Sequence, residues 1–239
     1  MTVRWDNASV GGNAMRVYAA VPSSDGPHPA VVVIHHGAGV DGFTQDVVNR
    51  LWREGYAAVA PDLFHRQPER LPEGKRRIDL LKDSEIIADV NATVSYLRNA
   101  GAGKVGIVGF CMGGRVVYLA AGASKDFSAG ACFYGGNIFK PWGGDGPTPF
   151  DRTKSVACPI IGFFGKDDPN PTPADVDKIS KELTKHGKEH RFYSYTGAGH
   201  AFQNFLADSY RERAAKDSWG KMLRFFEEKL KAREMAGVR

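Results

Sequence analysis

The chain has 239 residues, of which 42% are hydrophobic and 25% are charged, and its formal net charge is +5. Such a composition is typical of a globular protein, and the length suits one substantial core, so residues 1–239 are interpreted as a single domain. No apolar run approaches the roughly eighteen residues of a membrane span, and no basic run carries interleaved aromatic residues, which argues against membrane and nucleic-acid partners.

The first residues of the chain indicate its location in the cell, and the cysteines limit the chemistry that it can perform. The opening Met1-Thr-Val-Arg-Trp-Asp lacks the basic region and apolar stretch of a secretory signal, so a cytoplasmic location is expected. The three cysteines, Cys111, Cys132 and Cys158, are an odd number without metal-ligand spacing. This argues against disulfides and zinc, and neither a metal nor an organic cofactor is expected. Cys132 and Cys158 lie in apolar strand runs, which predicts core packing.

Short apolar runs alternate with helical patterns along the whole chain. Residues 2–8 and 14–21 indicate an antiparallel hairpin around Gly11-Gly12. Further strands are predicted at 30–34, 56–60, 105–110, 129–134, 159–164 and 191–195. Helices are predicted at 44–54, 78–98, 173–186 and 209–232, and another follows Gly114. This alternation predicts an α/β protein with a mostly parallel central sheet, helices on both faces and the N-terminal hairpin at the sheet edge.

Two irregular segments can border a site at the carboxyl ends of the strands. Residues 64–74 are polar and rich in Arg and Pro, which indicates an exposed loop long enough to cover a site. Residues 135–155 form a Gly, Pro and aromatic excursion without periodicity, which inside a compact domain is typical of a binding loop or a mobile loop. Trp142 within it and Tyr134 at the preceding strand end are candidate pocket residues.

The most informative stretch is Val105-Gly-Ile-Val-Gly-Phe-Cys-Met-Gly-Gly114. Its apolar beginning is typical of a buried parallel strand, and it ends in a Gly-x-Cys-x-Gly turn that leads into a helical pattern. Such a turn, a nucleophile elbow, strains the backbone of its central residue and needs small flanking residues, here Gly109 and Gly113. The thiol of Cys111 is therefore expected at the carboxyl edge of the sheet and at the amino end of a helix.

Three predicted strand ends carry reactive side chains in the order Cys111, then Asp167 or Asp168, then His200. This is the nucleophile, acid, histidine order of an α/β-hydrolase, a fold in which the strand ends share one edge of the sheet. The histidine would move the proton, and the carboxylate would fix the histidine tautomer and stabilise the imidazolium. A nearby imidazole and a helix amino terminus both favour a thiolate.

Attack of a thiolate on a carbonyl carbon also requires amide donors for the oxyanion. The α/β-hydrolase fold takes one from the residue after the nucleophile, Met112, and the other from the loop after the 30–34 strand, where Gly37 is the candidate. Two alternatives to ester or lactone hydrolysis remain open. The same site could attack another electrophile, such as a phosphotriester or a halogenated ester, or the elbow could serve a non-hydrolytic thiol sensor or ligand-binding protein.

These segments resemble the dienelactone hydrolase family of cysteine-centred α/β-hydrolases, and the resemblance covers nearly the whole chain. Its most specific parts are Gly109-Phe-Cys-Met-Gly-Gly114, Gly55-Tyr-Ala-Ala-Val-Ala-Pro-Asp-Leu63, Gly165-Lys-Asp-Asp-Pro-Asn-Pro171 and Gly197-Ala-Gly-His-Ala-Phe202. By position, the family's nucleophile matches Cys111 and its histidine matches His200. The family's Gly-x-x-Asp spacing selects Asp168 as the acid, with Asp167 as the alternative. The resemblance implies cleavage of a small-molecule ester or lactone through a thioacyl-enzyme, in a monomer or small homo-oligomer.

Two positions depart from the family pattern. Dienelactone-cleaving members carry a glutamate in the loop after the second core strand, where this chain has His36, and an arginine shortly after the histidine, where it has Asn204. These departures argue against dienelactone itself as the substrate but leave esterase or lactonase chemistry in place. His36 and Asn204 remain candidate substrate contacts. A positive charge for the substrate is available from Arg66, Arg70, Arg76 or Arg77.

Overall fold

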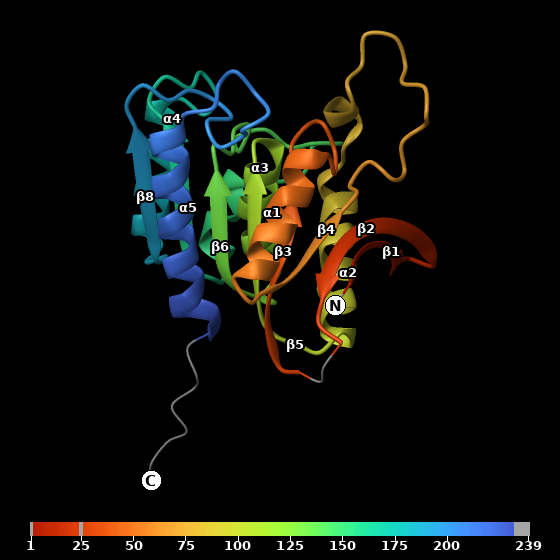
Figure 1. The fold of residues 1–239 in the computed structure, drawn as a ribbon. Helices are drawn as coiled ribbons and strands as arrows, with labels where there is room; N and C mark the ends of the chain where they lie inside the picture. Colours follow the sequence, from red (N-terminus) through yellow and green to blue (C-terminus); the bar gives the residue numbers. More distant parts are fainter. Residues whose placement is uncertain (1, 24–25, 232–239) are drawn as a thin grey trace.

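The computed structural model describes residues 2–23 and 26–231, which are built around an eight-stranded sheet (Figure 1). The strands are β1 (Thr2–Val10), β2 (Asn13–Val21), β3 (His28–Ile34), β4 (Ala57–Pro61), β5 (Ala102–Phe110), β6 (Phe127–Phe133), β7 (Ile160–Gly165) and β8 (His190–Tyr195). Their spatial order is β1-β2-β4-β3-β5-β6-β7-β8. The β1/β2 and β2/β4 pairs are antiparallel, and every other neighbouring pair is parallel. The predicted parallel sheet with an N-terminal antiparallel hairpin is confirmed.

Five α-helices of the described residues cover both faces of this sheet, as predicted. They are α1 (Gly42–Arg53), α2 (Asp83–Asn99), α3 (Met112–Ala123), α4 (Pro173–Lys185) and α5 (Glu212–Phe226). The apolar residues of α2, α3 and α4 pack in one core and those of α1 and α5 in another, in front of the sheet in Figure 1. In β3, Val32 faces the first core and Val33 the second, because successive side chains of a strand point to opposite faces. Burial on both sides explains why the parallel strands are uninterrupted apolar runs.

Two helices begin several residues later than the sequence predicts. The helix predicted at 78–98 begins at Asp83, and Ile78 lies in a separate 3₁₀ turn, Arg77–Leu80. Asp83 is fixed there by tertiary contacts with Arg115, which periodicity cannot reveal. The last helix begins at Glu212, three residues later than predicted, because Arg211 has extended backbone angles. It continues through a π-helical turn, Glu227–Lys231, and the predicted end at 232 lies outside the described residues.

The parallel strands place the connections that follow them at one edge of the sheet. The long loop after β4 and the segment after β6 both leave from this edge (Figure 1). The 135–155 excursion is irregular except for a 3₁₀ helix, Phe150–Ser155. Within the described residues, no helix is both long enough and apolar enough to cross a membrane.

Candidate active site

The elbow between β5 and α3 holds Cys111 in a strained conformation. Its φ of 57° and ψ of −118° lie outside the regions that residues with a side chain normally adopt, and it occupies the N-cap position of α3. The Cys111 amide donates a hydrogen bond to the Phe133 carbonyl oxygen at 3.0 Å, which fixes the turn to the end of β6. Cys111 is partly exposed, so its sulfur is both positioned and accessible.

The two elbow glycines are required by close backbone approach. A Cβ at Gly109 would lie 2.1 Å from the Gly113 carbonyl oxygen, and a Cβ at Gly113 would lie 2.4 Å from the Ile34 carbonyl oxygen. Neither glycine has a positive φ; the strained angle belongs to Cys111 alone among the three. The glycines therefore let α3 start directly against β5 and β3, which brings the helix amino end to the sheet edge.

Asp168 follows β7 and is paired with His200, which follows β8. The Asp168 Oδ2 atom lies 2.9 Å from His200 Nδ1, and its Oδ1 atom accepts a hydrogen bond from the Asn170 amide at 2.8 Å. Asp168 is only 3% exposed, whereas Asp167 is exposed and its amide donates to the Ala198 carbonyl oxygen. Of the two candidate acids, Asp168 is therefore the one in contact with the histidine.

The charge state of His200 reflects its two neighbours. Burial by itself lowers the pKa of the imidazole, but hydrogen bonds to Asp168 and Cys111 and the negative charges of both groups outweigh this effect and raise the pKa to about 10. With Nδ1 on the carboxylate, Nε2 is the ring nitrogen left for the sulfur. A pKa of about 10 keeps the His200 imidazole protonated at neutral pH.

Cys111 and His200 open onto a cavity of about 210 Å³. Its other lining residues come from the loop after β4, the start of α3 and the segments after β6 and β7: Arg76, Ile78, Met112, Gly136, Asn137 and Asn170. The cavity is thus assembled at the carboxyl edge of the sheet, where ligands of parallel α/β sheets bind.

The sequence did not single out Asn137 and Asn170, which line this cavity. The Asn170 side-chain oxygen accepts a hydrogen bond from the Asn137 amide at 3.1 Å and so joins the segments after β6 and β7. Asn137 has a positive φ of 55°, a conformation in which asparagine is enriched. The run Gly135-Gly136-Asn137 was the available signal for a tight bend at a strand end.

Arg76 is the member of the predicted arginine group that lines the cavity. Its guanidinium is paired with Asp79 at 2.8 Å on the exposed rim. Arg66 is instead bonded to the buried carboxylate of Asp89 at 2.6 Å. Arg77 lies against backbone oxygens of its own loop.

The predicted oxyanion donors differ in their placement. Met112 lines the cavity, and its amide belongs to the first turn of α3, where helix amides have no partner within the helix. Gly37 is exposed in the turn after β3, which is closed by a hydrogen bond from the Gly39 amide to the His36 carbonyl oxygen at 3.1 Å. Gly37 is not among the residues that line the cavity.

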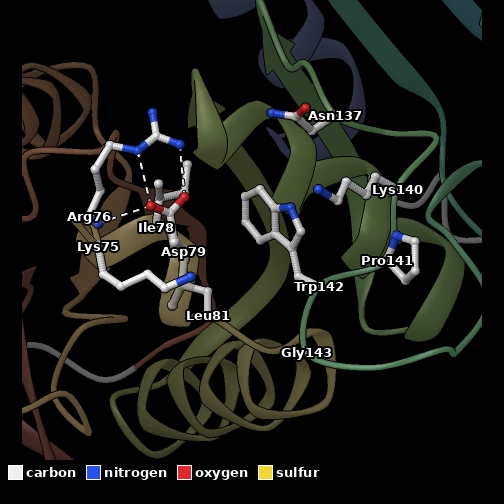
Figure 2. Close-up of a pocket in the computed structure, with 10 residues that line it drawn as sticks. All are labelled: Lys75, Arg76, Ile78, Asp79, Leu81, Asn137, Lys140, Pro141, Trp142 and Gly143. Atoms are coloured by element: carbon white, nitrogen blue, oxygen red, sulfur yellow. Dashed lines mark hydrogen bonds and ion pairs between the residues drawn. The ribbon is translucent and has the colours of Figure 1, made fainter. Parts of the chain in front are cut away.

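The other predicted substrate contacts are mostly engaged elsewhere. His36 Nε2 lies 2.9 Å from Asp41 Oδ2 at the start of α1, and the Asn204 side chain accepts a hydrogen bond from the Leu206 amide within its own loop. Tyr134 is 1% exposed, and its ring packs edge-on against the His200 imidazole with 5.2 Å between the ring centroids. Trp142 lines an adjoining cavity (Figure 2). Neither His36 nor Asn204 is among the residues that line the cavity with Cys111.

No group of three or more His, Cys, Asp or Glu side chains within residues 2–23 and 26–231 could hold a metal ion. The other two cysteines are buried, as predicted, and burial raises the pKa of each thiol to about 12. Among the described cysteines, Cys111 is therefore the one that is not buried.

The strand order, the elbow after β5 and the acid and histidine after β7 and β8 define an α/β-hydrolase. Residues 15–230 match the sequence profile of the dienelactone hydrolase family. The chain belongs to this family, as its motifs predicted.

Individual relatives agree with this assignment. A Synechocystis sp. protein provisionally named a carboxymethylenebutenolidase is 35% identical over 226 residues, which are 90% of this chain and 92% of the relative. A Bradyrhizobium sp. protein, provisionally named a 2-oxo-3-(5-oxofuran-2-ylidene)propanoate lactonase, is 29% identical over 92% of this chain and 91% of its own length. The crystal structure of a provisionally assigned dienelactone hydrolase from Klebsiella pneumoniae superposes with a TM-score of 0.87 at 28% identity, covering 95% of this chain and 100% of that one. The prediction of a carboxylic ester hydrolase is thus confirmed at the level of the family.

Proposed function

We propose that this protein hydrolyses a small-molecule ester or lactone by acyl transfer to the thiolate of Cys111. The observation that carries the proposal is His200, which is hydrogen-bonded to the buried carboxylate of Asp168 and lines the same cavity as Cys111 at the strand ends. A nucleophile, a proton carrier and a fixed carboxylate are the three groups that acyl transfer requires.

In the first half-reaction, the Cys111 sulfur attacks the carbonyl carbon and a tetrahedral intermediate forms. The Met112 amide, with Gly37 as the second candidate donor, stabilises its oxyanion. The carbon–oxygen bond to the leaving alkoxide then breaks, and the His200 imidazolium gives its proton to that oxygen. The products are a thioacyl-enzyme, a neutral imidazole and an alcohol, or the free hydroxyl end of an opened lactone.

In the second half-reaction, neutral His200 takes a proton from water, and the hydroxide oxygen attacks the thioester carbon. Collapse of this second intermediate breaks the carbon–sulfur bond and releases the acid. The thiolate of Cys111 and the imidazolium of His200 are regenerated as a pair. Asp168 stays ionised throughout, orienting the ring and stabilising its positive charge.

The decisive experiment is turnover of 4-nitrophenyl acetate by wild type and by Cys111→Ala. We expect at least a ~10⁴-fold loss of kcat in the variant, with the acetyl group of rapidly quenched wild type found by mass spectrometry on the Cys111 peptide. Cys158→Ala is the matched control, because that thiol is buried and lies outside the cavity. Near-normal turnover by Cys111→Ala would show that the nucleophile has been misassigned.

A wider set of substrates tests one alternative function, and the burial of the other two cysteines bears on the second. A phosphotriester such as paraoxon, run beside lactone and aryl ester substrates, tests the alternative electrophile, and preferential turnover of it would replace an ester as the substrate. A thiol sensor needs a second cysteine that can resolve a sulfenic acid. Burial keeps the pKa of Cys132 and Cys158 at about 12, which argues against that role.

A further inference from the structure

A second cavity of about 350 Å³ adjoins the one that contains Cys111. The two share Arg76, Ile78 and Asn137 in their walls, so they lie side by side. The second cavity lies between the loop after β4 and the excursion after β6, with Trp142 projecting into it (Figure 2). Leu81 and Pro141 add further apolar surface.

The wall that carries Trp142 is held rigidly by one buried side chain. Arg115, on α3, is 0% exposed. Its guanidinium donates hydrogen bonds to the Asn137 carbonyl oxygen at 3.0 Å and to the Lys140 carbonyl oxygen at 2.6 Å. It also forms a bidentate ion pair with Asp83, at 2.6 and 3.0 Å. Its guanidinium also stacks on the Trp142 ring, 3.9 Å from the centroid. The Trp142 amide donates to Asp83 as well, at 3.1 Å. This part of the predicted binding or mobile loop is therefore preorganised against the elbow helix, so little ordering would be required on binding.

The charge around the cavity is predominantly positive. Lys75, Arg76 and Lys140 line it, and the one acidic lining residue, Asp79, is already bonded to Arg76. Figure 2 shows this ion pair on one side of Trp142 and Lys140 on the other. Lys75 also lies close enough to Asp79 for its charge to help lower the pKa of that carboxyl, so the lining residues carry three positive charges and one negative charge. An aromatic ring with basic side chains on both sides and a net positive charge around it is suited to a flat ring that carries an anionic group.

We propose that this cavity is an extended substrate subsite that binds a carboxylate-bearing aromatic ring, while the scissile carbonyl of the same molecule lies at Cys111. The ring packs against Trp142 and the neighbouring apolar residues, and the carboxylate is attracted to Lys75 and Lys140. The substrate class is thus an ester or lactone with an aromatic acid on one side. This assignment rests on the proposed hydrolase function and narrows its substrate.

The test compares 4-acetoxybenzoate with its neutral methyl ester, methyl 4-acetoxybenzoate. We expect Lys140→Gln and Lys75→Gln each to lower the ratio of the two kcat/KM values by roughly 3- to 10-fold, because each removes one charge that only the anionic probe can use. Trp142→Ala should lower kcat/KM for both aryl probes. Lys125→Gln is the control, because this exposed lysine lies between α3 and β6, at the opposite edge of the sheet.

A binding measurement separates failure of the subsite from failure of the hydrolase proposal. Calorimetric titration of Cys111→Ala with the same two probes needs no turnover, and the anionic probe should bind more tightly by a margin that shrinks in Cys111→Ala/Lys140→Gln. An unchanged ratio in both lysine variants, or an equal change in Lys125→Gln, would overturn the subsite. Turnover that survives Cys111→Ala would overturn the hydrolase mechanism instead.

Discussion

The substitution Asp168→Asn removes the charge that faces His200 while it keeps the shape of the side chain. Asp168 accepts two hydrogen bonds, from the Asn170 amide at 2.8 Å and from His200 Nδ1 at 2.9 Å. An asparagine has only one oxygen. If that oxygen stays on the Asn170 amide, the side-chain NH₂ faces the imidazole, and Nδ1 must become the acceptor. The proton of the neutral ring then moves to Nε2, which is the wrong tautomer for accepting a proton at the sulfur side.

The expected fall in kcat reflects the loss of both the fixed imidazole tautomer and the negative charge beside it. We expect kcat to fall by about 10³- to 10⁴-fold, which corresponds to about 4 to 5.5 kcal/mol of transition-state stabilisation. The pKa of His200, about 10 in the native pair, should fall, because Asp168 contributes both a hydrogen bond and a negative charge. The assay is kcat and kcat/KM for an aryl ester between pH 6 and 11, where the alkaline limb should move to lower pH.

Asp167→Asn is the matched control for this experiment. It makes the same chemical change one residue away, at an exposed side chain whose backbone contact to Ala198 is unaffected. We expect less than a ~3-fold change in kcat. The reasoning fails if Asp168→Asn retains kcat within about tenfold of wild type, or if Asp167→Asn causes the larger loss.

Three further predictions concern pH, the elbow and the cavity wall. The pKa of His200 is about 10 in the folded protein and ~6.5 in the unfolded chain, so its contribution to stability is complete below about pH 6.5 and is lost as the pH rises through 10. Urea unfolding midpoints measured from pH 6 to 11 should show this loss in the wild type but not in His200→Gln. Gly109→Ala places a Cβ 2.1 Å from a backbone oxygen and should lower the free energy of unfolding, measured by urea titration, by about 3 kcal/mol or more. Gly146 has open space around it, so Gly146→Ala should change the free energy of unfolding little. Arg115→Met leaves the carboxylate of Asp83 without its buried partner and should lower the free energy of unfolding by about 3–5 kcal/mol. Arg53→Met, at an exposed arginine, is the control and should lower it much less.

The sequence predicted the sheet, the elbow and the chain order of the catalytic candidates because these depend on local patterns. Apolar runs such as Val105–Phe110 reveal strands buried on both faces, and glycines on both sides of Cys111 reveal the elbow. Parallel strands bring their carboxyl ends to one edge, so side chains far apart in the chain could be assigned to one site before any contact was known. The contact between Asp168 and His200 lies at this edge.

Only the tertiary structure decided which neighbouring side chains face the site. Asp167 and Asp168 are adjacent and chemically alike, and their burial separates them. His36 follows a core strand, yet its imidazole is bonded to Asp41 at the start of α1, a contact that periodicity does not predict. The cavity wall around Trp142 likewise depends on a buried arginine from a different element. Periodicity and turn chemistry determine where the chain reaches the sheet edge, whereas hydrogen-bond partners and burial, which involve distant segments, determine what each side chain does there.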